Sequence, residues 1–163
     1  MLDTIFGLPV HALVIHAVVV LIPLCALGVV VMAVWAVWRE RLRLPVWLLL
    51  VVGGFSTLLA KQSGEKLQAR VSTPGNPVQR QLINHHVSIG TQAVVVVFVF
   101  CVAVTVWLYL DWRPPAGMSA TVTKVMSVVA VVAAVAATGW VVWAGHAGST
   151  AVWQQTIVAT NPK

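Results

Sequence analysis

The sequence predicts an all-α protein folded as a bundle of four transmembrane helices. Of its 163 residues, 60% are hydrophobic and only 9% are charged, a balance that ordinary soluble domains do not have. A helix needs ~20 residues to cross a hydrocarbon core of ~30 Å. Four apolar runs reach or approach that length, at about residues 9–38, 44–61, 86–111 and 121–145. We therefore expect residues 1–163 to form a single four-span membrane domain.

The first run stays apolar from Leu8 to Trp38, and no basic stretch precedes it. A signal peptide would begin with such a stretch, so we expect this segment to be retained as a span. Pro9 suits its first helical turn, and Pro45 opens the second run just after the basic sequence 39–43.

The polar stretch 62–84 contains Pro74, Gly75 and Pro77 and is predicted to be the one sizeable loop. Pro114 and Pro115 break the chain again, between the third and fourth runs. Together these breaks define an up-and-down bundle in which each span returns across the membrane.

Lysine and arginine do not decide the orientation by number, because five lie on each side of the predicted membrane. Basic residues in short loops next to the first span have the strongest effect on orientation. Arg39, Arg41 and Arg43 follow that span directly. We therefore place this side in the cytoplasm and both termini outside. Tryptophans are expected to mark the membrane edges, with Trp35, Trp38, Trp47, Trp107 and Trp112 at the inner one and Trp140, Trp143 and Trp153 at the outer one.

The net charge of +6 does not indicate a nucleic-acid partner, because the basic residues stand in short groups at the ends of the apolar runs. Lipid headgroups and partner subunits are the expected counter-charges. Cys25 and Cys101 lie in the middle of their runs and are interpreted as small core residues.

The five histidines are His11, His16, His85, His86 and His146. In this topology all of them lie at the outer side of the membrane. Imidazoles from three different helices at one level are what a haem or metal site needs. His16 lies about 7 Å deeper than His11, counted at 1.5 Å per residue, where an imidazole needs a partner. We therefore assign His16 a buried functional role, whereas the other four are equally compatible with hydrated interfacial side chains.

Helix geometry limits which histidines can bind the same haem or metal ion. His11 and His16 differ by about 140° around the helix, and His85 and His86 by about 100°, so one member of each pair should face the bundle centre. This favours ligation across helices, with His16 and His86 as the best pair. His146 is expected as a third ligand or as a neighbour of the ligands, and His11 is a further candidate.

Charged groups at the same level could serve a cofactor. Haem b would place its propionates near the outer water, where Lys61, Lys66, Arg70 and Arg80 are available, although these residues could equally form a solvated basic loop. Glu65 could orient an imidazole, or pair with Lys61 at the i, i+4 spacing. Zinc or copper held by three histidines is the alternative to haem b.

Several kinds of chemistry have no motif in this chain. Covalent haem attachment would need Cys-x-x-Cys-His, which is absent. The sequence also contains no recognisable Ser-His-Asp set or phosphate-binding glycine loop, so hydrolytic and kinase chemistry have no support. We expect no independent catalytic activity.

Residues 8–16, which read LPVHALVIH, are similar to the His-Pro-x-x-Val-His-Phe-Pro opening of a large bacterial family of four-span membrane proteins catalogued as a domain of unknown function. Ala12 and Ala17 stand where that family usually has Pro and Phe. Its later motifs are resembled, in the same order, by Ser63-Gly64-Glu65, by His86 followed by Gly90, and by Gly145-His146-Ala147-Gly148. The resemblance implies a multi-pass protein of the bacterial cytoplasmic membrane in which His11, His16, His86 and His146 match the motif positions.

Three functions are compatible with these features. The first is a small membrane protein that binds haem b or a metal ion for one-sided electron transfer or redox sensing. The second is a non-catalytic accessory subunit, without a cofactor, of a larger membrane complex such as a respiratory one. The third, a transporter, ranks last because the inner halves of the spans offer few polar side chains.

Overall fold

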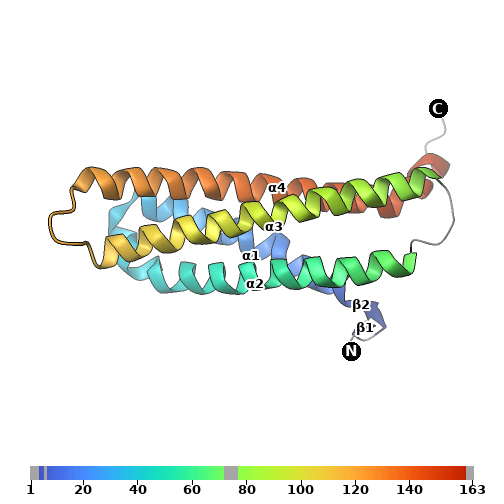
Figure 1. Cartoon of the computed structure of the whole chain (residues 1–163), viewed down its shortest axis with the longest axis horizontal. Coiled ribbons are helices and arrows are strands. Elements are labelled where there is room, and N and C mark those ends of the chain that lie inside the picture. The colour runs from blue at the N-terminus through green and yellow to red at the C-terminus, as the bar shows by residue number, and fades with distance from the viewer. Residues whose placement is uncertain (1–3, 6, 72–76, 161–163) are drawn as a thin grey trace.

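The computed structural model describes residues 4, 5, 7–71 and 77–160 as a bundle of long helices that run side by side (Figure 1). The elements in the described part of the chain are β1 (Thr4–Ile5), β2 (Leu8–Pro9), α1 (Val10–Val34), the 3-10 turn η1 (Ala36–Trp38), α2 (Arg39–Val71), α3 (Pro77–Trp112) and α4 (Ala120–Thr160). Each of the four bundle helices is long and apolar enough to cross a membrane. The all-α, four-helix prediction is therefore confirmed.

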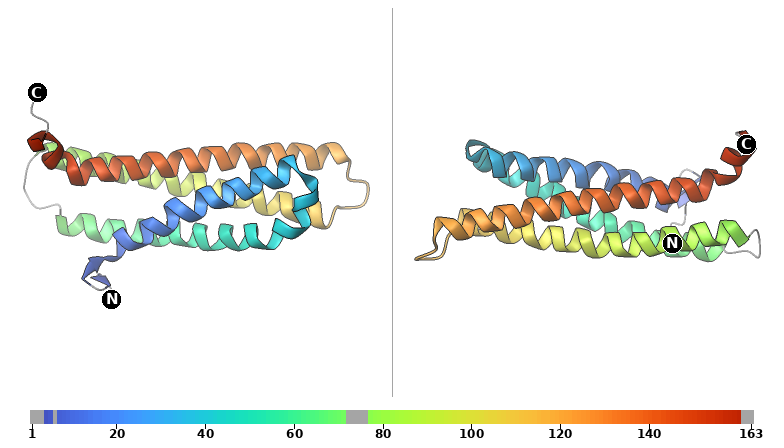
Figure 2. Two further views of the ribbon diagram at one scale, coloured as in Figure 1. Left: turned by 180° about the vertical axis from the view of Figure 1, so that it is seen from behind. Right: turned by 90° about the horizontal axis from the view of Figure 1, so that it is seen from above.

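The two ends of the bundle differ in what they contain. The strands that precede α1 and the last turns of α4 lie at the same end of the bundle (Figures 1 and 2). We call this end the histidine end and the opposite one, where η1 and the α3–α4 loop turn the chain, the arginine end. Before α1, β1 and β2 pair antiparallel with Thr4 opposite Pro9, and Gly7 turns between them with φ +80°, a conformation that favours glycine.

Three of the helices are much longer than the hydrocarbon core of a bilayer, which is ~30 Å thick. At 1.5 Å per residue, α2, α3 and α4 with 33, 36 and 41 residues measure about 50, 54 and 62 Å. The predicted loop over 62–84 is wrong for its described part, because residues 62–71 continue α2 and residues 77–84 begin α3. Residues 72–76, which include Pro74 and Gly75, lie outside the described residues. The helices therefore extend past the apolar runs at the histidine end.

The first span ends earlier than expected. α1 stops at Val34, because Trp35 adopts an extended conformation with φ −116° and ψ 95°. The basic sequence then already belongs to α2, and Pro45 lies inside that helix instead of opening it.

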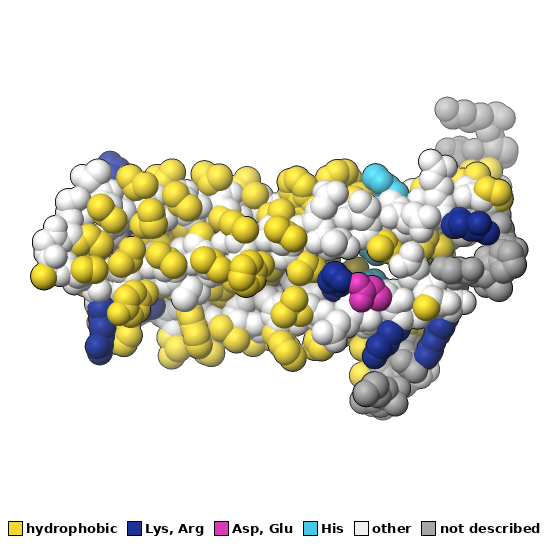
Figure 3. All heavy atoms as spheres, in the orientation of Figure 1, with side chains coloured by type: hydrophobic (Ala, Val, Ile, Leu, Met, Phe, Trp, Pro, Cys, Tyr) yellow, Lys and Arg dark blue, Asp and Glu magenta, His cyan; other side chains and the backbone are white. Residues whose placement is uncertain are grey.

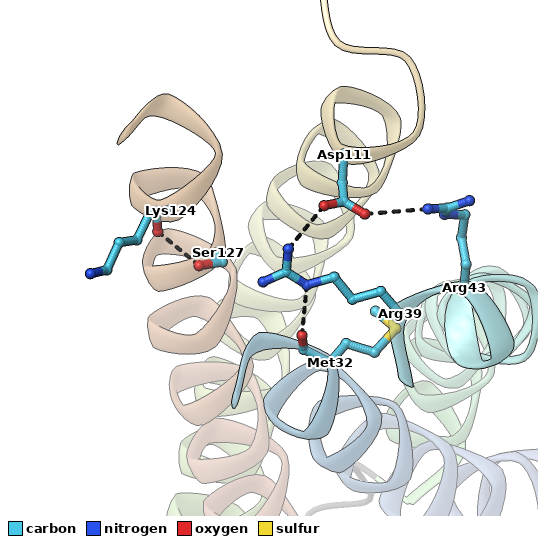
Figure 4. A network of polar contacts seen from close by, with 6 residues as sticks. All are labelled: Met32, Arg39, Arg43, Asp111, Lys124 and Ser127. Atoms are coloured by element: carbon cyan, nitrogen blue, oxygen red, sulfur yellow. Dashed lines mark hydrogen bonds and ion pairs between the residues drawn. The ribbon is translucent and has the colours of Figure 1, made fainter. Parts of the chain in front are cut away.

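An ion-pair network closes the arginine end (Figure 4). Asp111 near the end of α3 accepts from Arg39 at 3.1 Å and from Arg43 at 3.3 Å. The Nε of Arg39 donates to the Met32 carbonyl at 2.9 Å, which satisfies one of the carbonyls left unpaired at the end of α1. The network thus connects α1, α2 and α3 at one level. In α4, the Ser127 hydroxyl donates to the Lys124 carbonyl at 2.8 Å.

The core follows one stripe of each helix. Its spacing of three and four residues is clearest in α1, whose buried residues include Val18, Ile22, Cys25, Val29 and Met32, as expected for a packed helix face. α4 contributes mostly alanine to the core: Ala130, Ala133, Ala134, Ala137, Ala144, Ala147 and Ala151. Small residues of this kind let helix backbones approach closely within a membrane. Both cysteines are free, with Cys25 buried and Cys101 partly buried.

Hydrophobic side chains cover the surface between the two ends, whereas charged side chains gather at the ends themselves (Figure 3). We call this hydrophobic surface between the two ends the hydrophobic belt. A lipid bilayer is the environment that such a surface requires. Of the tryptophans expected at the membrane edges, six are exposed: Trp35, Trp38, Trp47, Trp112, Trp143 and Trp153. Trp107 is instead fully buried, at 0% exposure, with the Arg39 guanidinium 5.8 Å from its ring centroid. Its role is therefore in the core and not at the interface.

Candidate functional site

His11, on the first turn of α1, packs against the part of α2 at the histidine end. A backbone carbonyl can only accept, so the His11 Nδ1–H donates to the Ala60 carbonyl, at 2.8 Å. Gly64 lies one turn further along α2, beside the ring. A Cβ at Gly64 would come within 3.0 Å of His11 Cε1, so the imidazole occupies space that any other residue would fill.

His86, in α3, makes the equivalent contact with α4. Its Nδ1–H donates to the Ala144 carbonyl at 3.1 Å. A Cβ at Gly148, one turn further on, would lie 2.9 Å from His86 Cε1. The two hairpins of the bundle, α1–α2 and α3–α4, therefore use the same local arrangement of a histidine on one helix and Ala-x-x-x-Gly on the next.

The two anchored histidines meet where the hairpins join. The ring centroids of His11 and His86 are 6.1 Å apart, and the ring planes are inclined at 71°. Because Nδ1 of each ring carries the donated hydrogen, Nε2 of each neutral imidazole has a lone pair. An imidazole whose other nitrogen donates to a carbonyl is the usual form of a metal-binding histidine.

The expected burial of His16, on which its predicted pairing with His86 depended, is wrong. His16 is exposed, and its Nδ1–H donates to the Ala12 carbonyl one turn back in its own helix. His11 takes the inward position, since the 140° between the two residues allows only one of them to face the bundle centre. The hydrogen bond to Ala12 also explains how an imidazole at this depth is tolerated without a partner helix.

The remaining two histidines are exposed. His85 lies edge-on to Trp143, with ring centroids 6.4 Å apart. His146 is exposed as well. Within the residues that the structure describes, no three His, Cys, Asp or Glu side chains lie close enough to hold one metal ion. What the fold brings together is the pair of His11 and His86.

The charged residues expected to serve a cofactor lie in three different places. Lys61 forms an ion pair with Glu65 on the surface of α2, which confirms the i, i+4 alternative for that glutamate. Lys66 and Arg70 line a cavity beside His11. Arg80 is exposed on α3.

The sequence did not reveal that the carbonyls of Ala60 and Ala144 accept from the histidines, or that Gly64 and Gly148 leave room for the rings. The family resemblance includes both glycines in its motifs but gives them no role. The signal available was the Ala-x-x-x-Gly spacing at 60–64 and 144–148, which recurs in the two helices that accept a histidine. Glycine costs about 1 kcal/mol in a helix interior, so two such glycines at one level of a bundle indicate a close contact there.

Comparison with known proteins supports the membrane assignment and gives no activity. A family model described as "Predicted membrane protein (DUF2231)" matches residues 7–161. No curated protein and no solved structure matches the chain. Since the family model covers nearly the whole sequence, the chain belongs to the DUF2231 family of predicted membrane proteins.

Proposed function

We propose that this protein binds haem b through His11 and His86 and carries out electron transfer or redox sensing at one face of the membrane. The observation behind the proposal is the 6.1 Å separation of two imidazoles whose Nδ1 atoms are both bonded to carbonyls. Two metal–nitrogen bonds of about 2 Å, with half of each ring added, put imidazoles on opposite sides of one metal about 6 Å apart. The observed separation matches this requirement.

The surroundings of the pair fit the same group. The pair stands between two hairpins, so a planar ligand could be held from both sides by residues of different helices. Gly90, one turn after His86, has no neighbouring atom within 4 Å of the place a Cβ would take. That glycine therefore leaves room beside one of the two ligands.

Haem b, when bound, supplies reversible one-electron transfer. The residues of the chain hold the imidazoles in one tautomer and fix their direction through Ala60 and Ala144. All five histidines of the sequence belong to the histidine end, and a carrier across the membrane would need a second site near the arginine end. The proposed electron transfer is therefore one-sided, outside the cytoplasm if the arginines after α1 lie inside.

Two alternative functions are a site for a zinc or copper ion and a cofactor-free accessory subunit. A zinc or copper ion could use the same two nitrogens with further ligands from solvent. A cofactor-free accessory subunit is favoured by the surface around Trp143, which is 45% exposed and packs on Trp140 and His85. Gly139, on the same helix, has open space at its Cβ position, which a partner helix could use.

An absorption spectrum and a metal analysis of the protein purified in mild detergent test the proposal. We expect a Soret band and about one iron per chain, both lost in His11→Ala and His86→Ala. His85→Ala is the matched control, because it removes an adjacent but outward-facing imidazole, and it should keep the band. Stoichiometric zinc or copper without a Soret band would replace haem by the metal ion. A metal-free protein recovered in fixed ratio with a larger complex would establish the accessory subunit instead.

A further inference from the structure

A cavity of about 180 Å³ opens between the start of α1 and the outer part of α2. Its polar lining is formed by His11, Gln62, Ser63, Lys66 and Arg70, and its apolar lining by Pro9, Val10, Leu59 and Leu67. The volume is several times the ~30 Å³ that a water molecule occupies in the liquid. The cavity is therefore large enough for a small polyatomic group.

The charged side chains among the described lining residues are Lys66 and Arg70, and both are basic. Lys66 and Arg70 stand one helical turn apart and both border the cavity, whereas none of its described lining residues is acidic. The nearest acid in sequence, Glu65, is paired with Lys61 on the surface. Two cations with hydroxyl and amide groups beside them form a site that favours a phosphate oxyanion.

The position of the cavity also favours a ligand with an apolar part. Leu59, in its lining, belongs to the apolar run of α2, whereas Lys66 and Arg70 follow two and three turns later in the same helix, beyond that run. Lipid phosphates lie at this level of a membrane, with the acyl chains directed toward the belt. One phospholipid molecule could therefore contact the basic lining with its phosphate and the apolar lining with its acyl chains.

We propose that this cavity binds a phosphate group through Lys66 and Arg70, supplied either by the headgroup of an anionic phospholipid or by free inorganic phosphate. The proposal does not depend on haem. Binding here would attach the first turn of α1 to α2, directly beside the His11 anchor.

Native mass spectrometry of the full chain in detergent, titrated with phosphatidylglycerol, diacylglycerol or inorganic phosphate, tests this site. We expect one phosphatidylglycerol per chain, and no binding of diacylglycerol, which has the acyl chains without the phosphate, at the same concentration. The double variant Lys66→Gln/Arg70→Gln should weaken phosphatidylglycerol binding by at least about tenfold, since each cation near a headgroup contributes about 1 kcal/mol. Lys61→Gln/Arg80→Gln is the matched control, because it removes the same charge outside the cavity.

A second variant separates the cavity from its charges. Leu67→Trp would fill the cavity while keeping both cations, and it should weaken binding as well. Displacement of the lipid by millimolar phosphate would identify the free ion as the ligand, and resistance to it would identify the lipid. Equal weakening in both double variants, or equal binding of diacylglycerol, would overturn the proposal. Bound haem changes the mass separately, so failure here is distinct from failure of the haem proposal.

Discussion

At the scale of single residues, each inward histidine depends on a glycine of the neighbouring helix. His11 and His86 lie where a Cβ on Gly64 or Gly148 would have to be, and each bonds the carbonyl four residues before that glycine. The glycines therefore have a packing role that offsets their low helix propensity.

Alanine at these glycines should destabilise the protein. Gly64→Ala and Gly148→Ala place a methyl group within about 3 Å of an imidazole, and overpacking of this kind costs about 1–3 kcal/mol. Gly139→Ala, in the same type of helix interior but with open space at the Cβ position, should be neutral or stabilising by up to about 1 kcal/mol. Thermal unfolding in detergent, followed by circular dichroism, measures all three. Equal stability of the three variants would contradict the close contacts.

The sequence could narrow the histidine site but could not complete it. Helical periodicity required one inward member in each pair, which the structure satisfies with His11 and His86. Which member faces inward depends on the rotation of α1 in the bundle, and an apolar helix surrounded by valine gives little periodic signal for that rotation. Depth suggested His16, but a carbonyl of its own helix already satisfies that imidazole.

At the scale of helices, the stretch expected to be a loop is largely helical. Residues 61–70 are rich in Lys, Gln, Glu, Leu and Ala. These residue types have high helix propensity, so the helix continues beyond the apolar run. Counting apolar residues finds the part of a helix that lies in lipid, and it cannot find where the helix ends in water. The existence of four spans was therefore predictable, whereas the residues at which the helices begin and end were not.

Asp111 connects helices that are far apart in sequence, and its removal should loosen the arginine end. In Asp111→Asn, Arg39 and Arg43 lose their shared counter-charge at a site where the aspartate side chain is only 13% exposed. We expect a loss of about 1–3 kcal/mol, because charged partners would be left partly buried and unpaired. Glu65→Gln is the control: its pair with Lys61 is 56% exposed on the glutamate side and should contribute less than about 1 kcal/mol. The same unfolding assay compares them, and an equal effect would exclude a structural role for the network.

At the scale of the whole molecule, the orientation in the membrane decides which compartment the histidine site serves. The arginines that follow α1 predict a cytoplasmic arginine end. Single cysteines at Ala69 and Ala116, both exposed at opposite ends, can report it in a chain whose native cysteines are replaced. A membrane-impermeant thiol reagent should label position 69 in intact cells, and position 116 only after permeabilisation. The reverse pattern would place the site on the cytoplasmic face.

The proposed site depends on two helical hairpins that bring His11 and His86 to one centre. Electron paramagnetic resonance of the oxidised, purified protein tests this most directly, because ferric haem held by two imidazoles is low-spin, whereas ferric haem held by one imidazole and water is high-spin. We expect a low-spin signal of about one haem per chain that persists in His16→Ala and is lost in His11→Ala. A low-spin signal that survives in His11→Ala and disappears in His16→Ala would contradict it.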